Sequence, residues 1–142
     1  MSGFLLDTNI PSELTRRRPE PEVERWLEEA NDDDLFFSVI SLGEILQGIA
    51  VLPPSKRRED LQDWLDQTLR PWFGERILPI TAPVAERWGV LSAKCRTRGK
   101  QLKVADGLIA ARALHHDLVV VTRNVNDFTE LGLTVLNPWD GL

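Results

Sequence analysis

Short, uninterrupted apolar runs alternate along the chain with segments whose apolar residues recur every three or four positions. The uninterrupted runs are typical of strands covered on both faces, as in a parallel sheet flanked by helices, and the longer spacing predicts amphipathic helices. The predicted strands are 3–6, 35–40, 76–80, 118–122 and 133–136. The predicted helices are 10–17, 23–30, 41–52, 56–70, 82–96 and 104–114. The pattern therefore predicts a fold of the α/β class.

The length and composition fit a single domain that spans residues 1–142. Hydrophobic residues make up 42% of the chain and charged residues 27%, as in ordinary soluble proteins. No apolar run approaches the roughly 20 residues of a membrane span, and the N-terminus lacks the layout of a secretory signal. We therefore expect a cytoplasmic protein with no membrane contact. The single cysteine, Cys95, excludes an internal disulfide, and its apolar neighbourhood predicts a buried thiol.

The first strand ends at three consecutive hydrogen-bonding side chains, Asp7, Thr8 and Asn9. Open α/β sheets bind their ligands at the carboxyl ends of the strands, so Asp7 is a candidate catalytic residue and Thr8 and Asn9 are candidate polar groups of the same site. The alternative is that Asp7 only caps the helix that follows, because Asp, Thr and Asn are all good N-caps.

Glu44 also has two interpretations. It follows Ser41 by three residues, which is the spacing of a capping box at the start of a helix. At about 100° per residue, however, Glu44 projects away from the apolar face formed by Leu42, Ile45 and Leu46. In that direction it can face the same crevice as Asp7, and the sequence leaves both interpretations open.

Two more acids stand near predicted strand ends. Asp106 lies in the first turn of a helix, where the helix dipole favours a carboxylate, and a right-handed crossover to the next strand places it at the carboxyl edge of the sheet. Asp127 comes shortly after the fourth strand, where Asn124 and Asp127 have the positions of an N-cap and its N3 partner.

Four carboxylates at one crevice repel one another unless a cation neutralises them. Oxygen ligands without His or Cys suit Mg2+ or Mn2+, and a metal-bound water loses its proton more easily. This reasoning predicts phosphoryl transfer by a metal-activated water. The pair His115 and His116 fits a helix C-terminus better than a metal site.

The chain contains a set of motifs in a specific order and spacing. They are Leu5-Leu6-Asp7-Thr8-Asn9, Ser41-Leu42-Gly43-Glu44 with Gly48, Asp106-Gly107-Leu108-Ile109-Ala110-Ala111, Val121-Thr122-Arg123-Asn124 with Asp127-Phe128, and Asn137-Pro138. Together they resemble the PIN-domain ribonucleases of the VapC toxin group, close to the FitB-like members, over nearly the whole chain.

The resemblance implies a three-layer α/β/α sandwich with a central parallel sheet. It implies that Asp7 and Asp106 bind Mg2+ directly, that Glu44 completes the site and that Asp127 matches the fourth acid of many members. Some relatives carry an acid at the position of Asn124, so either residue can be the one near the metal. The resemblance also implies a homodimer, a cognate antitoxin of a type II toxin-antitoxin system, and cleavage of single-stranded parts of structured RNA such as tRNA.

Positive charge is concentrated before Asp106, although the net charge of the chain is -5. Because acids alone repel RNA and because phosphates bind Lys and Arg, we predict that four basic residues flank the acidic crevice and bind RNA phosphates. These residues are Arg96, Arg98, Lys100 and Arg123.

Two other functions fit parts of the pattern. A catalytically silent PIN-like module that binds RNA or protein keeps the fold without the reaction, although all four acids are present here. An aspartyl-phosphate phosphatase also begins with a strand that ends in Asp, but its second acid lies two residues later, where this chain has Asn9.

Overall fold

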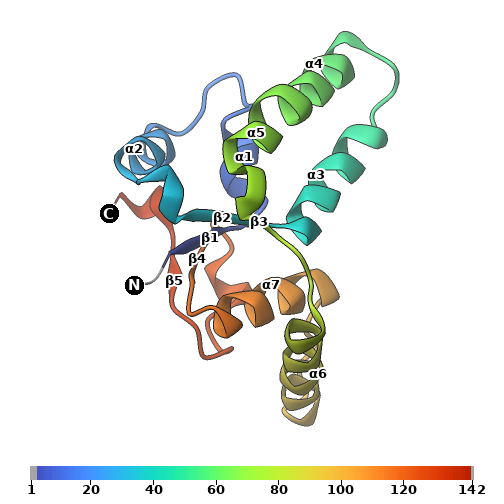
Figure 1. The fold of residues 1–142 in the computed structure, drawn as a ribbon, viewed down its shortest axis with the longest axis vertical. Helices are drawn as coiled ribbons and strands as arrows, with labels where there is room; N and C mark the ends of the chain where they lie inside the picture. Colours follow the sequence, from blue (N-terminus) through green and yellow to red (C-terminus); the bar gives the residue numbers. More distant parts are fainter. Residues whose placement is uncertain (1–2, 142) are drawn as a thin grey trace.

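The computed structural model describes residues 3–141, and a parallel sheet of five strands divides it (Figure 1). The strands are β1 (Phe4–Leu6), β2 (Leu35–Ser38), β3 (Ile77–Leu78), β4 (Val119–Val121) and β5 (Val135–Leu136). Their order in the sheet is β3-β2-β1-β4-β5, and all four pairings are parallel. The predicted parallel sheet is confirmed, with β1 at its centre.

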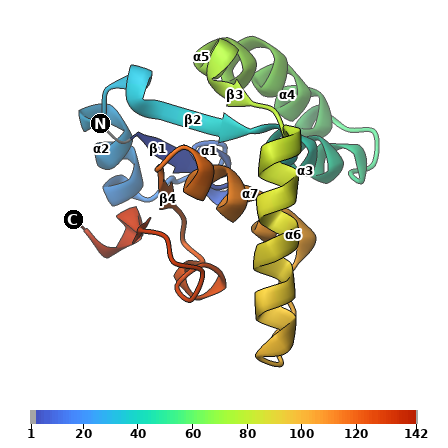
Figure 2. The same ribbon diagram turned by 60° about the horizontal axis from the view of Figure 1, so that its bottom comes forward.

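Helices cover both faces of the sheet. They are α1 (Asn9–Glu13), α2 (Pro21–Glu29), α3 (Val39–Ala50), α4 (Lys56–Trp64), α5 (Arg70–Phe73), α6 (Ala82–Thr97) and α7 (Val104–His115). Figure 1 shows α1 to α5 on one side of the sheet and α6 and α7 on the other, and the turned view in Figure 2 shows α6 extending well beyond the sheet. This is the predicted three-layer arrangement. Among residues 3–141, no helix has the length and apolar character needed to cross a bilayer.

Alternate residues of the central strand enter different hydrophobic cores. Leu6 packs with Val23, Phe37 and Leu65 in the core under α1 to α5. Leu5 packs with apolar residues of α7 and β4 in the core on the opposite face. Both leucines are fully buried, as expected for a strand with helices on both sides.

Several predicted element ends are wrong by a few residues. The first helix is shorter than predicted and ends at Glu13. The second strand ends at Ser38, because the Ser38 Oγ accepts a hydrogen bond from the Ile40 N–H (3.0 Å) and starts α3 there. Leu46 is 40% exposed and lies outside the apolar face to which we assigned it. The predicted helix over 56–70 continues through a π-helical turn, Leu65–Leu69, into α5.

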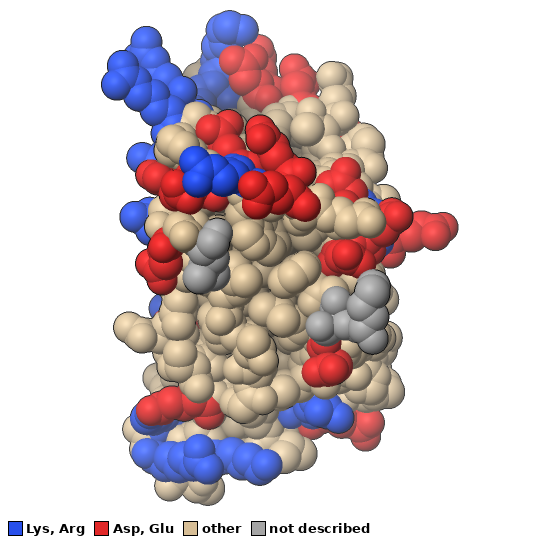
Figure 3. Space-filling view, turned by 90° about the vertical axis from the view of Figure 1, so that its left-hand side faces the viewer, with Lys and Arg blue, Asp and Glu red and all other residues tan. Residues whose placement is uncertain are grey.

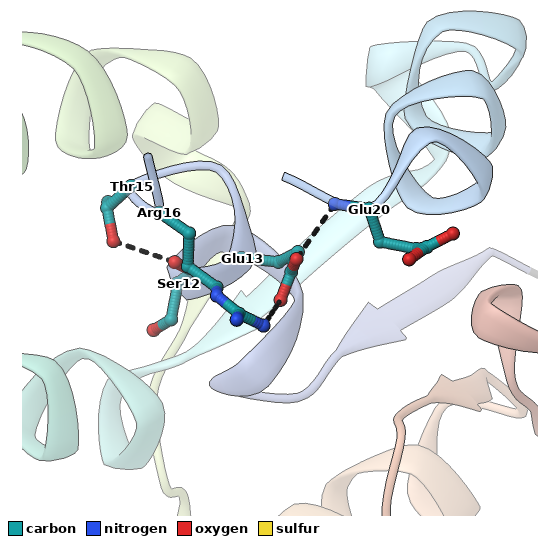
Figure 4. Close-up of polar contacts among 5 residues, drawn as sticks. All are labelled: Ser12, Glu13, Thr15, Arg16 and Glu20. Atoms are coloured by element: carbon teal, nitrogen blue, oxygen red, sulfur yellow. Dashed lines mark hydrogen bonds and ion pairs between the residues drawn. The ribbon is translucent and has the colours of Figure 1, made fainter. Parts of the chain in front are cut away.

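A buried carboxylate joins the end of α1 to the start of α2 (Figure 4). Glu13 is only 4% exposed, and its Oε2 accepts a hydrogen bond from the backbone N–H of Glu20 (2.8 Å). Its Oε1 pairs with Arg16 at 3.3 Å. The Glu13 side chain therefore fixes the path of the segment that leads from the first helix to the second.

Replacing Glu13 with Ala should lower the free energy of unfolding by about 1–3 kcal/mol, because the Glu20 N–H loses its buried partner. Urea denaturation followed by circular dichroism measures the difference. The matched control is Glu28→Ala, which removes an exposed glutamate of α2 and should change stability little. Equal free energies of unfolding for the two variants would show that the Glu13 contact does not stabilise the fold.

The charged side chains are unevenly distributed over the surface. Figure 3 shows a face whose middle is largely uncharged, with a band of Lys and Arg across its lower end. The same end of the molecule holds the C-terminus of α6 in Figure 1, where the sequence carries Arg96, Arg98 and Lys100. Figure 3 also shows Lys and Arg at the upper end of this face, so the lower band is one of several concentrations of positive charge on a chain whose net charge is negative.

Candidate active site

The carboxyl ends of β1 and β4 lie side by side at one edge of the sheet. The chain runs outward from β1 to β2 and β3, and then returns to place β4 on the opposite side of β1. Such a reversal of strand order is where open α/β sheets bind ligands. Asp7 directly follows β1, and Thr122 directly follows β4. The Asp7 N–H donates to the Val121 carbonyl (2.8 Å), so the two strand ends are held together at this point.

The carboxylate of Asp7 is buried, with 6% exposure, and is held by three donors. The Thr122 hydroxyl donates to Oδ2 at 2.7 Å, and the Thr8 N–H donates to Oδ1 at 2.8 Å. The Asn9 amide also donates to Oδ2, at 3.3 Å. The N-cap of α1 is Thr8 and no side chain accepts a capping hydrogen bond there, so the capping interpretation of Asp7 is wrong.

Asn9 and Thr122 extend this network across the strand ends. The Asn9 amide nitrogen also donates to the Thr122 Oγ1 (3.3 Å), and the Asn9 Oδ1 accepts from the Arg123 N–H (3.2 Å). The Asn124 N–H donates to the same Thr122 Oγ1 at 3.0 Å. Thr122 thus connects the segment after β4 to Asp7. We assigned Thr122 no role from the sequence, although it ends β4 as Asp7 ends β1.

Glu44 reaches the same network from α3. Because α3 begins at Val39 with Ser38 as its N-cap, Ser41 is not the cap and the capping box between Ser41 and Glu44 is wrong. Ser41 is instead buried inside the helix. The Glu44 carboxylate is exposed and its Oε1 accepts a hydrogen bond from the Thr8 hydroxyl at 2.7 Å. The structure therefore brings Glu44 to the side of Asp7.

Asp106 enters the crevice from the first turn of α7. The position of this turn depends on a close contact with α6, because a Cβ atom at Gly107 would lie 2.7 Å from the Trp88 Cδ1 and 2.9 Å from a methyl carbon of Leu102. Only glycine permits this approach of the two helices. Asp106 and Asp127 together line a hollow of about 200 Å³.

Asp127 comes from the short 3-10 turn Val125–Asp127 that follows β4, and its side chain is exposed. Asn124 is the N-cap residue of this turn, as predicted, but its side chain makes no capping hydrogen bond. Asn124 and Asp127 line one surface pocket together. Both residues therefore remain candidates for the fourth polar group of the site.

The electrostatics of the crevice show that its acids act on one another. Burial raises the pKa of Asp7 above its ordinary value, and the negative charges of Glu44 and Asp127 raise this pKa further. The hydrogen bonds from Thr122 and from the Thr8 N–H oppose this rise, because they stabilise the ionised carboxylate.

The pKa of Asp106 is also raised by burial and by the charges of neighbouring acids. Its pKa is raised to about 6, first by burial and then by the negative charges of Asp127, Asp7 and Glu44. The positive charge of Lys103, the N-cap residue of α7, lowers the pKa in part. The four acids thus lie within electrostatic reach of one another, although they are separated by up to 120 positions in the sequence.

The basic residues divide into two groups. Arg98 and Lys100 line the hollow that holds Asp106 and Asp127, and Lys100 also forms an ion pair with Glu130. Arg123 lies over the Trp139 ring, 5.2 Å from its centroid, and shares the surface pocket of Asp127.

Arg96 does not line the acidic hollow, and its phosphate-binding role stays a prediction. As a residue of the helix α6, it points to a neighbouring hollow instead. Lys103 lines the acidic hollow and was missed as a candidate, although it stands three residues before Asp106. Cys95 lines the same hollow and is partly exposed, so the predicted buried thiol is wrong.

The residues of the crevice fit a divalent cation by their chemistry. Asp7, Glu44, Asp106 and Asp127 offer only oxygen ligands, and none of them forms an ion pair with a basic side chain within residues 3–141. Within this part of the chain, no three acids, histidines or cysteines converge on one ready-made metal position. Carboxylate oxygens are the ligands that Mg2+ uses in proteins, together with several waters.

Replacing Thr122 with Val should reduce the activity of the site about 10–100-fold, as expected when a supporting hydrogen bond to a metal-binding or catalytic carboxylate is lost. Val has nearly the same shape but lacks the hydroxyl that donates to Asp7. Thr122→Ser is the control, since it keeps the hydroxyl and should retain most of the activity. Equal rates for the Val and Ser variants would contradict the positioning role.

Comparison with known proteins adds an independent result. The PIN domain family model matches residues 4–132. Toxin FitB of Neisseria gonorrhoeae is 38% identical over 136 residues, which cover 96% of this chain and 98% of FitB. VapC ribonuclease Y4jK of Sinorhizobium fredii is 35% identical over 137 residues, with 96% and 98% coverage. The crystal structure of FitAcB from Neisseria gonorrhoeae has a TM-score of 0.90 to this chain at 38% identity, covering 96% of this chain and 98% of that one. The chain therefore belongs to the PIN domain family, within its group of VapC and FitB toxins.

Proposed function

We propose that this protein is a metal-dependent endoribonuclease, the toxin of a type II toxin-antitoxin system, and that it hydrolyses phosphodiester bonds in tRNA or another structured RNA. The observation that carries this proposal is the group of four carboxylates at the strand-order reversal. Beyond the effect of burial, the charges of Glu44 and Asp127 raise the pKa of both Asp7 and Asp106, and no basic side chain within residues 3–141 forms an ion pair with any of the four acids. Charges of this kind are retained where a cation and a phosphodiester are to be bound.

Each acid has a role that follows from its position. Asp7 and Asp106 are the buried or partly buried carboxylates and would hold Mg2+, or Mn2+ in its place, with Glu44 on the exposed side. When bound, the metal neutralises the carboxylates and favours deprotonation of water for attack on phosphorus. Asp127 is an exposed residue of the lining of the acidic hollow, where it can accept a proton from an incoming water.

The other residues position these groups. Thr122, Thr8 and Asn9 hold the Asp7 carboxylate in one orientation, and Thr8 also holds Glu44. Arg98, Lys100 and Lys103 line the acidic hollow and supply positive charge for the phosphates on either side of the bond that is cut. In this proposal the acids act at the phosphate of the bond that is cut, and the basic residues bind the adjacent phosphates of the RNA.

The decisive experiment is an RNA cleavage assay with the purified chain, free of any bound partner. We expect labelled tRNA and unpaired RNA to be cut with Mg2+ or Mn2+, and the products to disappear when EDTA is added. Cleavage that continues in EDTA would contradict the metal-dependent reaction. Binding of RNA without any cleavage would favour the catalytically silent module, and a phosphorylated Asp7 trapped with a phosphate ester would favour the phosphatase.

Removing phosphate contacts should change the salt dependence of RNA binding. Replacing Arg96 and Arg98 together with Ala should weaken RNA binding and reduce the slope of log Kd against log salt by about 0.7 for each lost contact with a single strand. Fluorescence anisotropy over a series of salt concentrations measures the slope. A control pair, Arg87 and Lys94 changed to Ala, lies elsewhere on α6 and should leave the slope unchanged. The same slope in both pairs would refute the assignment.

The family membership also supports partners and a location for this chain. We assign it a cognate antitoxin that blocks the acidic crevice, a homodimeric state and a place in the cytoplasm, where its RNA substrate is found. Light scattering measures the dimer, and purification with the neighbouring reading frame tests the antitoxin.

A further inference from the structure

A second hollow shares a wall with the acidic one. It has a volume of about 630 Å³, within the roughly 300–1,000 Å³ of small-ligand sites. Three residues line both hollows, namely Lys100, Gln101 and Leu102. A polymer that is bound in the acidic hollow can therefore extend into the second hollow across these three residues. Neither the family match nor the catalytic acids account for the second hollow.

One wall of the second hollow is a regular stripe of α6. Trp88, Ser92 and Arg96 follow one another at intervals of four residues, so their side chains lie on the same face of the helix. Gln101, from the segment that connects α6 to α7, and Val104, the first residue of α7, also line the hollow. The hollow is thus formed by the same helix pair that positions Asp106.

The lining of the second hollow combines three kinds of surface. Arg96 supplies a positive charge that forms no ion pair within residues 3–141, and no acidic residue lines the hollow. The partly exposed indole of Trp88 and the side chain of Val104, 59% exposed, supply apolar surface. Ser92 and Gln101 supply hydrogen-bond donors and acceptors.

These three surfaces match the three parts of a nucleotide. A phosphate pairs with Arg or Lys, a ribose offers hydroxyl groups, and a base offers flat apolar faces that stack on aromatic side chains. Inorganic phosphate would use Arg96 alone and leave the apolar wall of the hollow uncovered. A base in a duplex is stacked and paired, so only an unpaired nucleotide has its faces free to enter.

We propose that the second hollow binds one unpaired nucleotide of the RNA substrate, next to the bond that is cut in the acidic hollow. The proposal rests on the proposed ribonuclease function. Arg96 binds the phosphate of this nucleotide, and its base lies against Trp88 and Val104. The second hollow thereby selects RNA that is single-stranded beside the cleavage site.

Binding measurements with defined RNAs test the proposal. The probes are a fluorescein-labelled single-stranded RNA of ten nucleotides and the duplex of the same sequence, both in EDTA so that the RNA stays intact. We expect Arg96→Ala to weaken single-strand binding and to lower its salt slope by about 0.7, the value for one phosphate contact. Ser92→Trp fills the hollow without changing its charge and should weaken single-strand binding about tenfold. Duplex binding should be the same for Ser92→Trp and the unchanged chain.

A control and a direct localisation complete the test. Arg87→Ala removes the same charge from the same helix, nine residues away and on the opposite face, and should bind both RNAs like the unchanged chain. RNA that carries 5-iodouridine should cross-link on irradiation to the segment 88–104. Single-strand binding that is unaffected by Arg96→Ala and Ser92→Trp, or cross-links only outside 88–104, would overturn the proposal even if the chain cleaves RNA. Absence of cleavage by the unchanged chain with Mg2+ would instead contradict the ribonuclease function.

Discussion

Replacing Asp7 with Asn should reduce RNA cleavage by more than about 100-fold, which is the largest effect that we expect from any single substitution. Asn has the same shape and keeps an oxygen that can accept the hydrogen bond from Thr122 or Thr8, but it carries no charge with which to hold a divalent cation. The measurement is the single-turnover rate of cleavage of a labelled RNA, with Mg2+ at saturation.

Asp63→Asn is the control for this substitution. Asp63 is an exposed residue of α4 and lies outside the acidic hollow, so the charge change is the same and the cleavage rate should not fall. Isothermal titration with Mg2+ separates the causes, because only the Asp7 variant should lose metal binding. Cleavage by the Asp7 variant at the unchanged rate would remove the basis for a metal-dependent reaction at this crevice.

Replacing Asp106 with Asn should also reduce cleavage strongly, although less than Asp7→Asn, and should stabilise the metal-free protein at neutral pH. The pKa of Asp106 is about 6 in the folded chain and 3.8 for an ordinary Asp. Between these values the folded state binds more protons than the unfolded state, so its stability falls as the pH rises from about 4 to 6 and is lowest above that range. Asn cannot ionise, and the variant therefore avoids this loss.

Thermal unfolding in EDTA measures the effect. We expect the melting temperature of the variant to exceed that of the unchanged chain by a few degrees at pH 7, and the two values to converge near pH 4. Addition of Mg2+ should raise the melting temperature of the unchanged chain and leave that of the variant nearly constant. A variant that is less stable than the unchanged chain at pH 7 in EDTA would show that the charge of Asp106 does not destabilise the folded state.

The sequence is a good guide to the fold because hydrophobic spacing determines which faces are buried. The apolar runs at β1 and β4 and the helical stripe of α6 are each visible without a structure. Element ends are harder to predict, because they depend on which of two similar caps is used. Ser38 and Ser41 are both good N-caps, and the β-branched pair Val39-Ile40 suits a strand as well as a helix.

The site was predictable only where a side chain follows a strand end or has a clear helical direction. Asp7 meets the first condition and Glu44 the second. The part played by Thr122 depends on β4 lying beside β1, which is a matter of strand order and has no local signal. Arg96 and Arg98 line different hollows because α6 ends at Thr97, between them. Arg96 belongs to the helix, whereas Arg98 is its C-cap and begins the following segment.

The contact between Gly107 and Trp88 makes the acidic crevice sensitive to events on the outer surface of the molecule. Since the backbone of α7 touches the indole directly, there is no spare room to absorb a shift of α6 before it moves the first turn of α7. A ligand or a second subunit that tilts α6 would therefore also displace the first turn of α7, and with it the Asp106 carboxylate, without contacting Asp106.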